Sequence, residues 1–292
     1  MNRIAAGGRV QARLVSALGS YDEIRARLLR IAESPSADLA EGALLIAAEE
    51  YPNLDLPESL DFLDDIAASA AARLGADAES GTARVVLTDE IFRERGFAGD
   101  ADDYYDPRNS LLSDVIERRR GIPITLSIVY VATAKRIGQR ASGVNAPGHF
   151  LVRHGDSIID AFCGGREVGR AEFAERLREA GAPDPAEAVA RLLAEPPTHR
   201  EILSRVLGNL KATHLRRREM DRALADVDRL VLLNPDQPAW LRERAALFQH
   251  LGCPHAAIAD LERFCELAPH DPERNVVRRA LAQLVRNAPA VH

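Results

Sequence analysis

Residues 119–138 read RRGIPITLSIVYVATAKRIG, and this stretch decides the fold of the chain. Gly121-Ile122-Pro123 interrupts the helical spacing that precedes it, and proline is tolerated in the first turn of a helix but not inside one. A strongly apolar run follows from 124 to 137, and Gly138 ends it. The stretch therefore predicts a buried central helix that begins near Pro123.

Two short strands are predicted after this helix. Residues 150–153 (FLVR) and 157–160 (SIID) are rich in apolar side chains, and the His154-Gly155-Asp156 segment between them is a hairpin turn signal. A helix packed on a small antiparallel sheet is an α+β arrangement. We therefore predict a mostly helical α+β protein.

Helical patterns lie on the N-terminal side of this core. Over residues 21–74 apolar residues recur at helical spacing, and Pro35, Pro52 and Pro57 mark the helix boundaries. This pattern predicts three or four antiparallel helices. Further helices are predicted over residues 85–92 and 111–116, with a connection of small residues at 75–81.

An internal repeat is visible near the C-terminus. The triplet at 233–235 (LNP) recurs at 267–269 (LAP), and the pairs at 223–224 and 257–258 align at the same offset of 34 residues. This period, with proline ending each helix pair, is the tetratricopeptide signature. A plain helical bundle is the alternative, because only about two copies are evident. Tetratricopeptide arrays usually hold protein segments, so a protein or peptide partner is expected.

Composition argues against nucleic acid and membrane partners. The 292-residue chain has 46% hydrophobic and 28% charged residues, a formal charge of −6, and acids interleaved with its basic residues. Its N-terminus has no apolar run long enough for a signal peptide, and no later segment could span a bilayer. Three cysteines without a CxxC pair argue against a disulfide framework. We predict a cytoplasmic protein.

His149 and Asp160 are the leading candidates for chemistry. They stand eleven residues apart across the predicted hairpin, so they can lie on adjacent strands with both side chains on one face. The carboxylate could then orient the imidazole, as in the base-and-orienter half of a catalytic triad. The alternative is a hydrogen bond that only fixes the sheet.

Four colinear segments resemble the SirB family of bacterial proteins. They are residues 104–110 (YYDPRNS), 119–127 (RRGIPITLS), 143–153 (GVNAPGHFLVR) and 159–165 (IDAFCGG). The resemblance extends from about residue 39 to residue 168, and the same core is similar to that of a group of eukaryotic F-box proteins. It implies a transglutaminase/papain-like core with tetratricopeptide repeats behind it, as in the bacterial members.

The wider transglutaminase and papain-like superfamily carries a nucleophilic cysteine two residues after a glycine at the start of the central helix. By this resemblance Gly121, His149 and Asp160 match the glycine, histidine and aspartate, but the cysteine position is Pro123. Proline has no nucleophilic atom, so we expect the inherited acyl-transfer chemistry to be absent and the His-Asp dyad to be vestigial.

Two other residues could replace the missing sulfur. Thr125 stands two positions further into the same helix, although threonine there also suits helix capping. Cys163 follows Asp160 by three residues, although a cysteine behind a strand is more often a small hydrophobe. With either nucleophile the chain would be a hydrolase or acyltransferase that uses His149 and Asp160.

Four residues near the helix before Gly121 are candidates for partner binding: Tyr105, Asn109, Arg119 and Arg120. Arginine suits bidentate recognition of a carboxylate or a peptide C-terminus. The alternatives are helix capping by Asn109 and local salt bridges from the arginines to preceding acids.

We predict three parts: an N-terminal helical region at 20–100 that shares a core with the next part, a transglutaminase-like core at 101–185, and helical repeats at 196–288. The histidines lack metal-site spacing, so no metal or cofactor is predicted. The expected function is that of a non-catalytic scaffold or regulatory module that binds a protein or peptide. The alternatives are the enzyme described above and a regulatory role in transcription through a partner.

Overall fold

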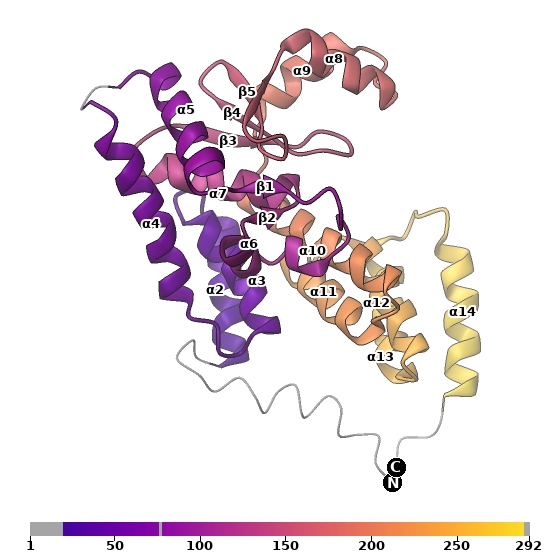
Figure 1. Ribbon diagram of the computed structural model, residues 1–292. Coiled ribbons are helices and arrows are strands. Elements are labelled where there is room, and N and C mark those ends of the chain that lie inside the picture. The colour runs from indigo at the N-terminus through magenta and orange to yellow at the C-terminus, as the bar shows by residue number, and fades with distance from the viewer. Residues whose placement is uncertain (1–19, 76–77, 289–292) are drawn as a thin grey trace. The chain divides into compact units, whose positions relative to one another are not determined.

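A computed structural model describes residues 20–75 and 78–288 (Figure 1). The first 19 residues, where we predict no signal peptide, lie outside the described residues, and so do residues 76–77 of the predicted connection. The chain divides into two compact units, one up to Val206 and one from Leu207. The finer division into a helical region and a core stays a prediction.

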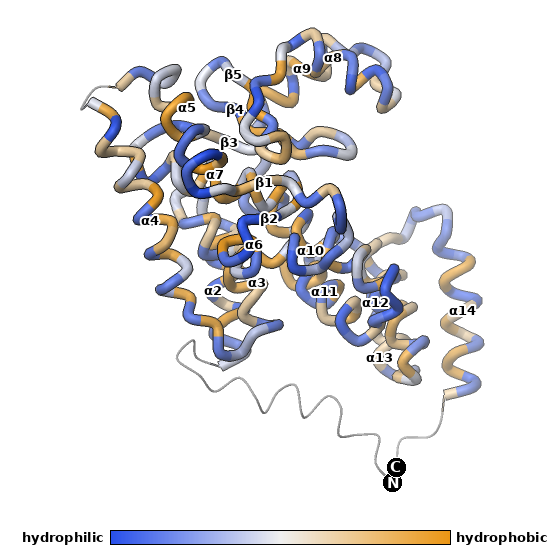
Figure 2. Tube along the Cα trace, in the orientation of Figure 1, coloured by the Kyte–Doolittle hydropathy of each residue, from blue (hydrophilic) through white to orange (hydrophobic). Residues whose placement is uncertain are grey.

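Three capped helices open the first unit. They are α2 (Tyr21–Glu33), α3 (Leu39–Glu50) and α4 (Leu56–Ala72). The side chains of Ser20, Asp38 and Asp55 each accept a hydrogen bond from the first turn of the helix that follows. Orange and blue alternate along α4, as expected of a helix with one buried side (Figure 2). The predicted helices and their breaks are confirmed.

The segment before the central helix is mostly helical. Helix α5 (Ser80–Thr88) continues into a π-helical turn (Asp89–Glu94), and α6 (Leu112–Arg118) follows a short 3-10 turn (Pro107–Asn109). The π-helical turn holds Glu90 inside, where its carboxylate accepts hydrogen bonds from Arg73 and Arg95. Burial of a carboxylate requires such partners.

The predicted central helix is α7 (Pro123–Arg136). Proline is at its first position, and Thr125 Oγ1 accepts a hydrogen bond from the Ile122 backbone amide over 3.2 Å. Helices α3, α4 and α6 and strands β3 (Ala141–Val144) and β4 (Leu151–His154) surround α7. This environment explains why its sequence is apolar on nearly every side.

The sheet is antiparallel with the order β3-β4-β5-β6. Strands β4 and β5 (Ser157–Asp160) form the predicted hairpin, and the sequence prediction missed β3 and β6 (Arg166–Val168). Helices α8 (Arg170–Glu179) and α9 (Pro185–Ala194) lie over one face of the sheet (Figure 1). On the other face Tyr130 of α7 meets His154 of β4 at 2.9 Å. The sheet is therefore a buried middle layer between helices.

Two very short strands lie beside the start of α7. Strand β1 (Ala98–Gly99) pairs in parallel with β2 (Arg120–Gly121), which directly precedes Ile122. A Cβ atom on Gly99 would lie 2.5 Å from the ring of Phe162. Only glycine therefore lets the loop after β5 lie against β1.

The second unit consists of helices joined at the predicted 34-residue period. They are α11 (Met220–Leu233), α12 (Pro238–His250), α13 (Pro254–Leu267) and α14 (Arg274–Asn287), and α10 (His199–Arg216) includes the unit boundary. Both ends of α13 lie 34 residues after those of α11. Asp226 and Asp260, which are also 34 residues apart, are both buried. The repeat is thus present in the packing as well as in the sequence.

Candidate functional site

The structure brings His149 and Asp160 together. His149 stands just before β4 and Asp160 is the last residue of β5, and His149 Nε2 lies 2.9 Å from Asp160 Oδ1. The His149 side chain is 24% exposed, whereas that of Asp160 is 1% exposed. No hydrogen bond from the described residues reaches Nδ1 of His149. One imidazole nitrogen is therefore fixed by the carboxylate, and the other can meet a ligand.

Asp160 is held as an anion inside the protein. Arg176 of α8 donates to Asp160 Oδ2 over 3.2 Å, and the backbone amide of Cys163 donates to Oδ1 over 3.3 Å. Burial by itself would raise the pKa of Asp160, but hydrogen bonds and charge from His149 and Arg176 lower it to about 2. The dyad is therefore an ordered ion network at neutral pH.

Sequence reasoning missed Arg176. Its guanidinium also donates to Glu172 over 2.7 Å, and Arg166 of β6 meets the same carboxylate with two hydrogen bonds of 2.7 and 2.9 Å. The Glu172 and Arg176 pair at i,i+4 spacing could have indicated an ion pair on α8. The spacing alone could not have shown that this helix covers Asp160.

Arg205 of α10 was also missed, and it holds the loop that carries His149. It donates to the Asn145 side chain, to the Ala146 carbonyl over 3.1 Å and to the His149 carbonyl over 2.8 Å. Its guanidinium carbon lies 5.4 Å from the centroid of the Phe150 ring. Burial lowers the pKa of Arg205, while its hydrogen bonds satisfy the charged group.

Aromatic rings surround the open side of His149. The Phe162 ring stands edge-on to the imidazole at 6.4 Å, the Tyr104 ring lies 6.0 Å from Phe162, and Tyr105 lies 5.3 Å from Tyr104. Tyr104 and Tyr105 are 38% and 48% exposed. We refer to Tyr104, Tyr105, Phe162 and His149 together as the aromatic surface. Phe162 also lies on Gly99, so this surface adjoins the β1–β2 pair before Pro123.

Pro123 is buried in the first turn of α7, where no hydroxyl or thiol takes its place. Thr125 is fully buried, and its hydroxyl donates to the Asn109 carbonyl over 2.8 Å while accepting from the Ile122 amide. These bonds make Thr125 a structural residue at the start of α7. The geometry gives no support to Thr125 as a nucleophile.

Cys163 lies beside the dyad, because its amide donates to the oxygen of Asp160 that also meets His149. The residue is exposed. Partial burial of the sulfur and the negative charge of Asp160 raise the pKa of the Cys163 thiol. A nucleophilic cysteine needs the opposite shift, because the thiolate is the reactive form.

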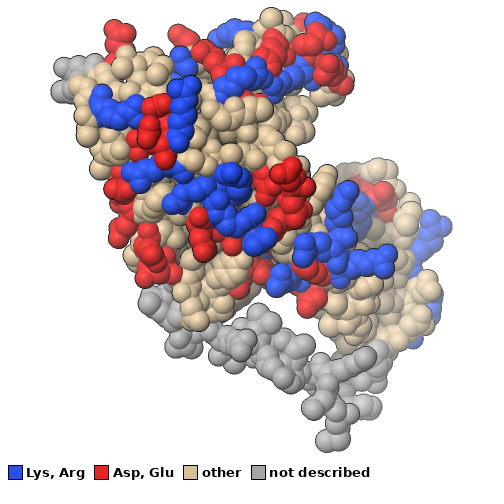
Figure 3. All heavy atoms as spheres, in the orientation of Figure 1, with Lys and Arg blue, Asp and Glu red and all other residues tan. Residues whose placement is uncertain are grey.

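The other predicted partner-binding residues have structural contacts. Asn109 is buried and joins the Asp103 carbonyl, at 2.8 Å, to Arg118, at 3.1 Å. Arg119 has a left-handed φ of 58° and lies over the Phe62 ring at 4.0 Å. Arg120 donates to the Gly96 carbonyl over 3.1 Å. Basic side chains form a band across the first unit in Figure 3, with acidic side chains bordering it.

Among residues 20–75 and 78–288, no group of three or more histidine, cysteine, aspartate or glutamate side chains is arranged to hold a metal ion. Within the same residues, none of the helices combines the length and the apolar character needed to cross a bilayer.

Comparison with known families agrees with this architecture. A family model described as the transglutaminase-like superfamily matches residues 58–208, just over half of the chain. The chain belongs to the transglutaminase-like superfamily. A tetratricopeptide repeat model matches residues 210–282 of this transglutaminase-like chain, which confirms the predicted combination of core and repeats.

Bacterial proteins resemble this transglutaminase-like chain over most of its length. A UPF0162 protein of Xylella fastidiosa is 35% identical over 265 residues, which cover 88% of this chain and 93% of that protein. A UPF0162 protein of Pseudomonas aeruginosa is 34% identical over 256 residues, which cover 87% and 93%. Protein SirB1 of Salmonella typhimurium is 25% identical over 274 residues, which cover 89% and 97%. The resemblance to the SirB family is confirmed.

Proposed function

We propose that this chain is a non-catalytic member of its superfamily, a regulatory or scaffold module that binds a protein or peptide segment. The observation that supports this most is Pro123, which stands buried where the resemblance implies a catalytic cysteine. Proline supplies neither a nucleophile nor a proton. Its fixed φ angle instead starts α7, so the position serves folding.

The aromatic surface is the proposed binding site in the first unit. Tyr104 and Tyr105 present large rings that lose little conformational entropy on binding, and both are partly exposed. Nδ1 of His149 adds a polar group whose ring is already oriented by Asp160. A peptide could therefore gain both apolar contact and one directed hydrogen bond there.

The helical repeats are the proposed second surface. The tetratricopeptide match indicates a capacity to bind protein, and the partner itself is part of the proposal. We place the protein in the cytoplasm, which suits its three free cysteines.

The alternative function is a cysteine-dependent hydrolase or acyltransferase, and one observation favours it: Cys163 and His149 share the Asp160 carboxylate. The raised pKa of the Cys163 thiol argues against it, because a thiol near a carboxylate stays protonated. The binding function therefore fits the site better.

Selection of a displayed peptide library on the full chain tests the binding function. We expect selected peptides to lose at least about ten-fold in affinity, about 1.4 kcal/mol, with Tyr105→Ala and with His149→Gln. Val85→Ala on α5 is the matched control, because Val85 is also exposed and lies outside the aromatic surface. Failure to select binders, or binders indifferent to both variants, would remove the proposed site.

A further inference from the structure

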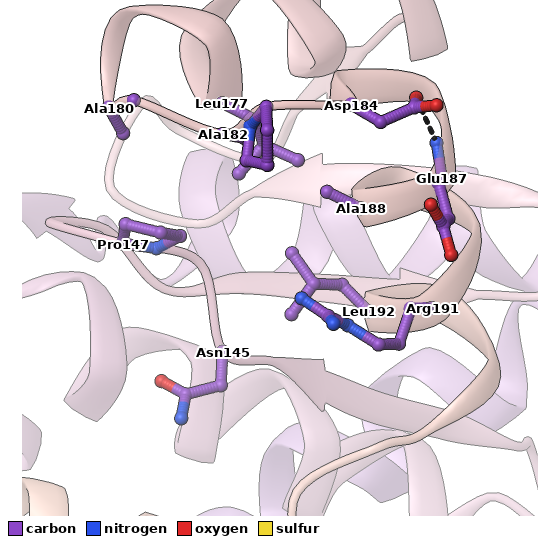
Figure 4. Close-up of a pocket in the computed structure, with 12 residues that line it drawn as sticks. Asn145, Pro147, Leu177, Ala180, Ala182, Asp184, Glu187, Ala188, Arg191 and Leu192 are labelled. Carbon is purple, nitrogen blue, oxygen red and sulfur yellow. Dashed lines mark hydrogen bonds between the residues drawn. The ribbon is translucent and has the colours of Figure 1, made fainter.

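A pocket separate from the aromatic surface lies between the loop before His149 and the helices α8 and α9. Its volume is about 360 Å³, and its walls include Pro147, Leu177, Ala182, Ala188, Arg191 and Leu192 (Figure 4). We call it the α8–α9 pocket. Its walls are mainly aliphatic, and its size is suited to a small organic group.

The loop wall of this pocket is held rigidly. Asn145 and Pro147 line the pocket, and Arg205 fixes Asn145 and the Ala146 carbonyl from outside it. The opposite wall is built on α8 and α9, whose residues Leu177, Val189 and Leu193 pack into the core cluster over the sheet. The pocket is therefore formed before any ligand arrives.

Three charged side chains stand at the pocket. Asp184 is occupied as the cap of α9, because its carboxylate accepts from the Glu187 backbone amide over 3.0 Å. The Glu187 carboxylate lies at the outer edge in Figure 4, whereas Arg191 extends along Leu192 toward the side where Pro147 lies. In the described part of the chain the Arg191 side chain makes no hydrogen bond or ion pair.

An unpaired guanidinium beside an aliphatic wall is complementary to a carboxylate attached to an aliphatic group. A peptide C-terminus that ends in an aliphatic residue has this chemistry. Pro147 stands only two residues before His149, so a peptide seated in the pocket has a short path along the loop to the aromatic surface. A free aliphatic acid would leave that path unused.

We propose that the α8–α9 pocket binds the C-terminal residue of a peptide, with the carboxylate on Arg191 and the aliphatic side chain against Leu177, Ala182, Ala188 and Leu192. This assignment names the ligand class of the peptide-binding function proposed above and rests on it.

Calorimetric titration of the full chain tests the assignment with one probe in two forms, the tripeptide N-acetyl-Ala-Ala-Leu as free acid and as C-terminal amide. We expect the acid to bind about ten-fold more tightly than the amide, and Arg191→Gln to abolish this difference. Glu187→Gln is the matched control one turn earlier on α9, and it should leave the preference for the acid intact or increase it. Equal binding of acid and amide, no binding of either, or an unchanged preference in Arg191→Gln would overturn the proposal.

Two further arms separate the remaining explanations. Hexanoate should bind at least about ten-fold more weakly than the tripeptide acid, and equal binding would overturn the peptide assignment in favour of a free aliphatic acid. Tyr105→Ala lies outside the pocket, so tripeptide binding should respond to Arg191→Gln and not to Tyr105→Ala. The pocket assignment would then stand even if the aromatic surface proved to bind no peptide.

Discussion

Arg205 donates a hydrogen bond to the backbone carbonyl of His149 over 2.8 Å. Two more bonds, to Asn145 and Ala146, make this guanidinium the main support of the loop that carries the imidazole. The orientation of His149 thus depends on a residue 56 positions away in the sequence as well as on its carboxylate partner.

Replacing Arg205 by glutamine should loosen this loop. The change removes hydrogen bonds from a charged donor and leaves buried carbonyls without a partner, so we expect the free energy of unfolding to fall by about 3 kcal/mol. Urea denaturation measures that loss, and the NMR signals of the His149 ring should broaden in the variant. Arg191→Gln is the control, with a change within about 0.5 kcal/mol, because Arg191 has no side-chain partner. Equal stability of the two variants would contradict the role given to Arg205.

Asp160 should make stability depend on acid pH. Its pKa is about 2 in the folded protein and about 3.9 in an unfolded chain, so the native state favours the ionised form. The resulting stabilisation, about 2 kcal/mol, is fully present above pH ~4 and is lost as the pH falls toward ~2. Urea denaturation at a series of pH values should show a smaller acid-induced loss in Asp160→Asn than in the wild type. The exposed control Asp102→Asn should follow the wild type, and parallel curves for Asp160→Asn would refute the prediction.

Cys163 should be a slow thiol. Its raised pKa keeps it protonated near neutral pH, so its alkylation by iodoacetamide, followed by mass spectrometry of its tryptic peptide, should be slower than that of glutathione. Asp160→Asn removes the negative charge and should speed the reaction several-fold. A wild-type rate above that of glutathione would point instead to an activated nucleophile.

Asp260 should contribute strongly to the stability of the repeats. Arg244 of α12 binds its carboxylate with two hydrogen bonds of 2.7 and 2.8 Å, and Asp260 is buried. Asp260→Ala leaves the arginine without this partner, so we expect a loss of about 3 kcal/mol. The control Asp228→Ala removes a more exposed partner of the same arginine and should cost at most about 1 kcal/mol. Fluorescence of Trp240, the single tryptophan, reports unfolding of this unit, and equal costs would show that burial of Asp260 is not what matters.

The parts of the fold that the sequence predicted correctly are those with a local signal. The apolar run after Pro123 is long enough to identify α7, and the turn at Gly155 identifies the β4–β5 hairpin. Strands β3 and β6 were missed because ASGV and REV are short and do not alternate apolar with polar residues. Their pairing comes from neighbouring strands, which single-sequence patterns do not show.

The candidate site was predicted only in part for a similar reason. His149 and Asp160 could be paired because a hairpin fixes the strand register between them. Arg176 and Arg205 act through contacts 16 and 56 residues away, and no spacing rule reaches that far. Thr125 and Asn109 looked like possible site residues because polar side chains at helix starts serve both capping and chemistry, and only their burial distinguishes the two roles.

The most direct test of a non-catalytic core is the intact mass of the full chain after incubation with a panel of acyl thioester and acyl fluorophosphonate-type probes. The account predicts that the wild type and His149→Ala both stay unmodified apart from the slow background expected of an ordinary thiol. A rapid acyl adduct on Cys163 or Thr125 that disappears in His149→Ala would contradict it, because such an adduct requires a nucleophile activated by the dyad.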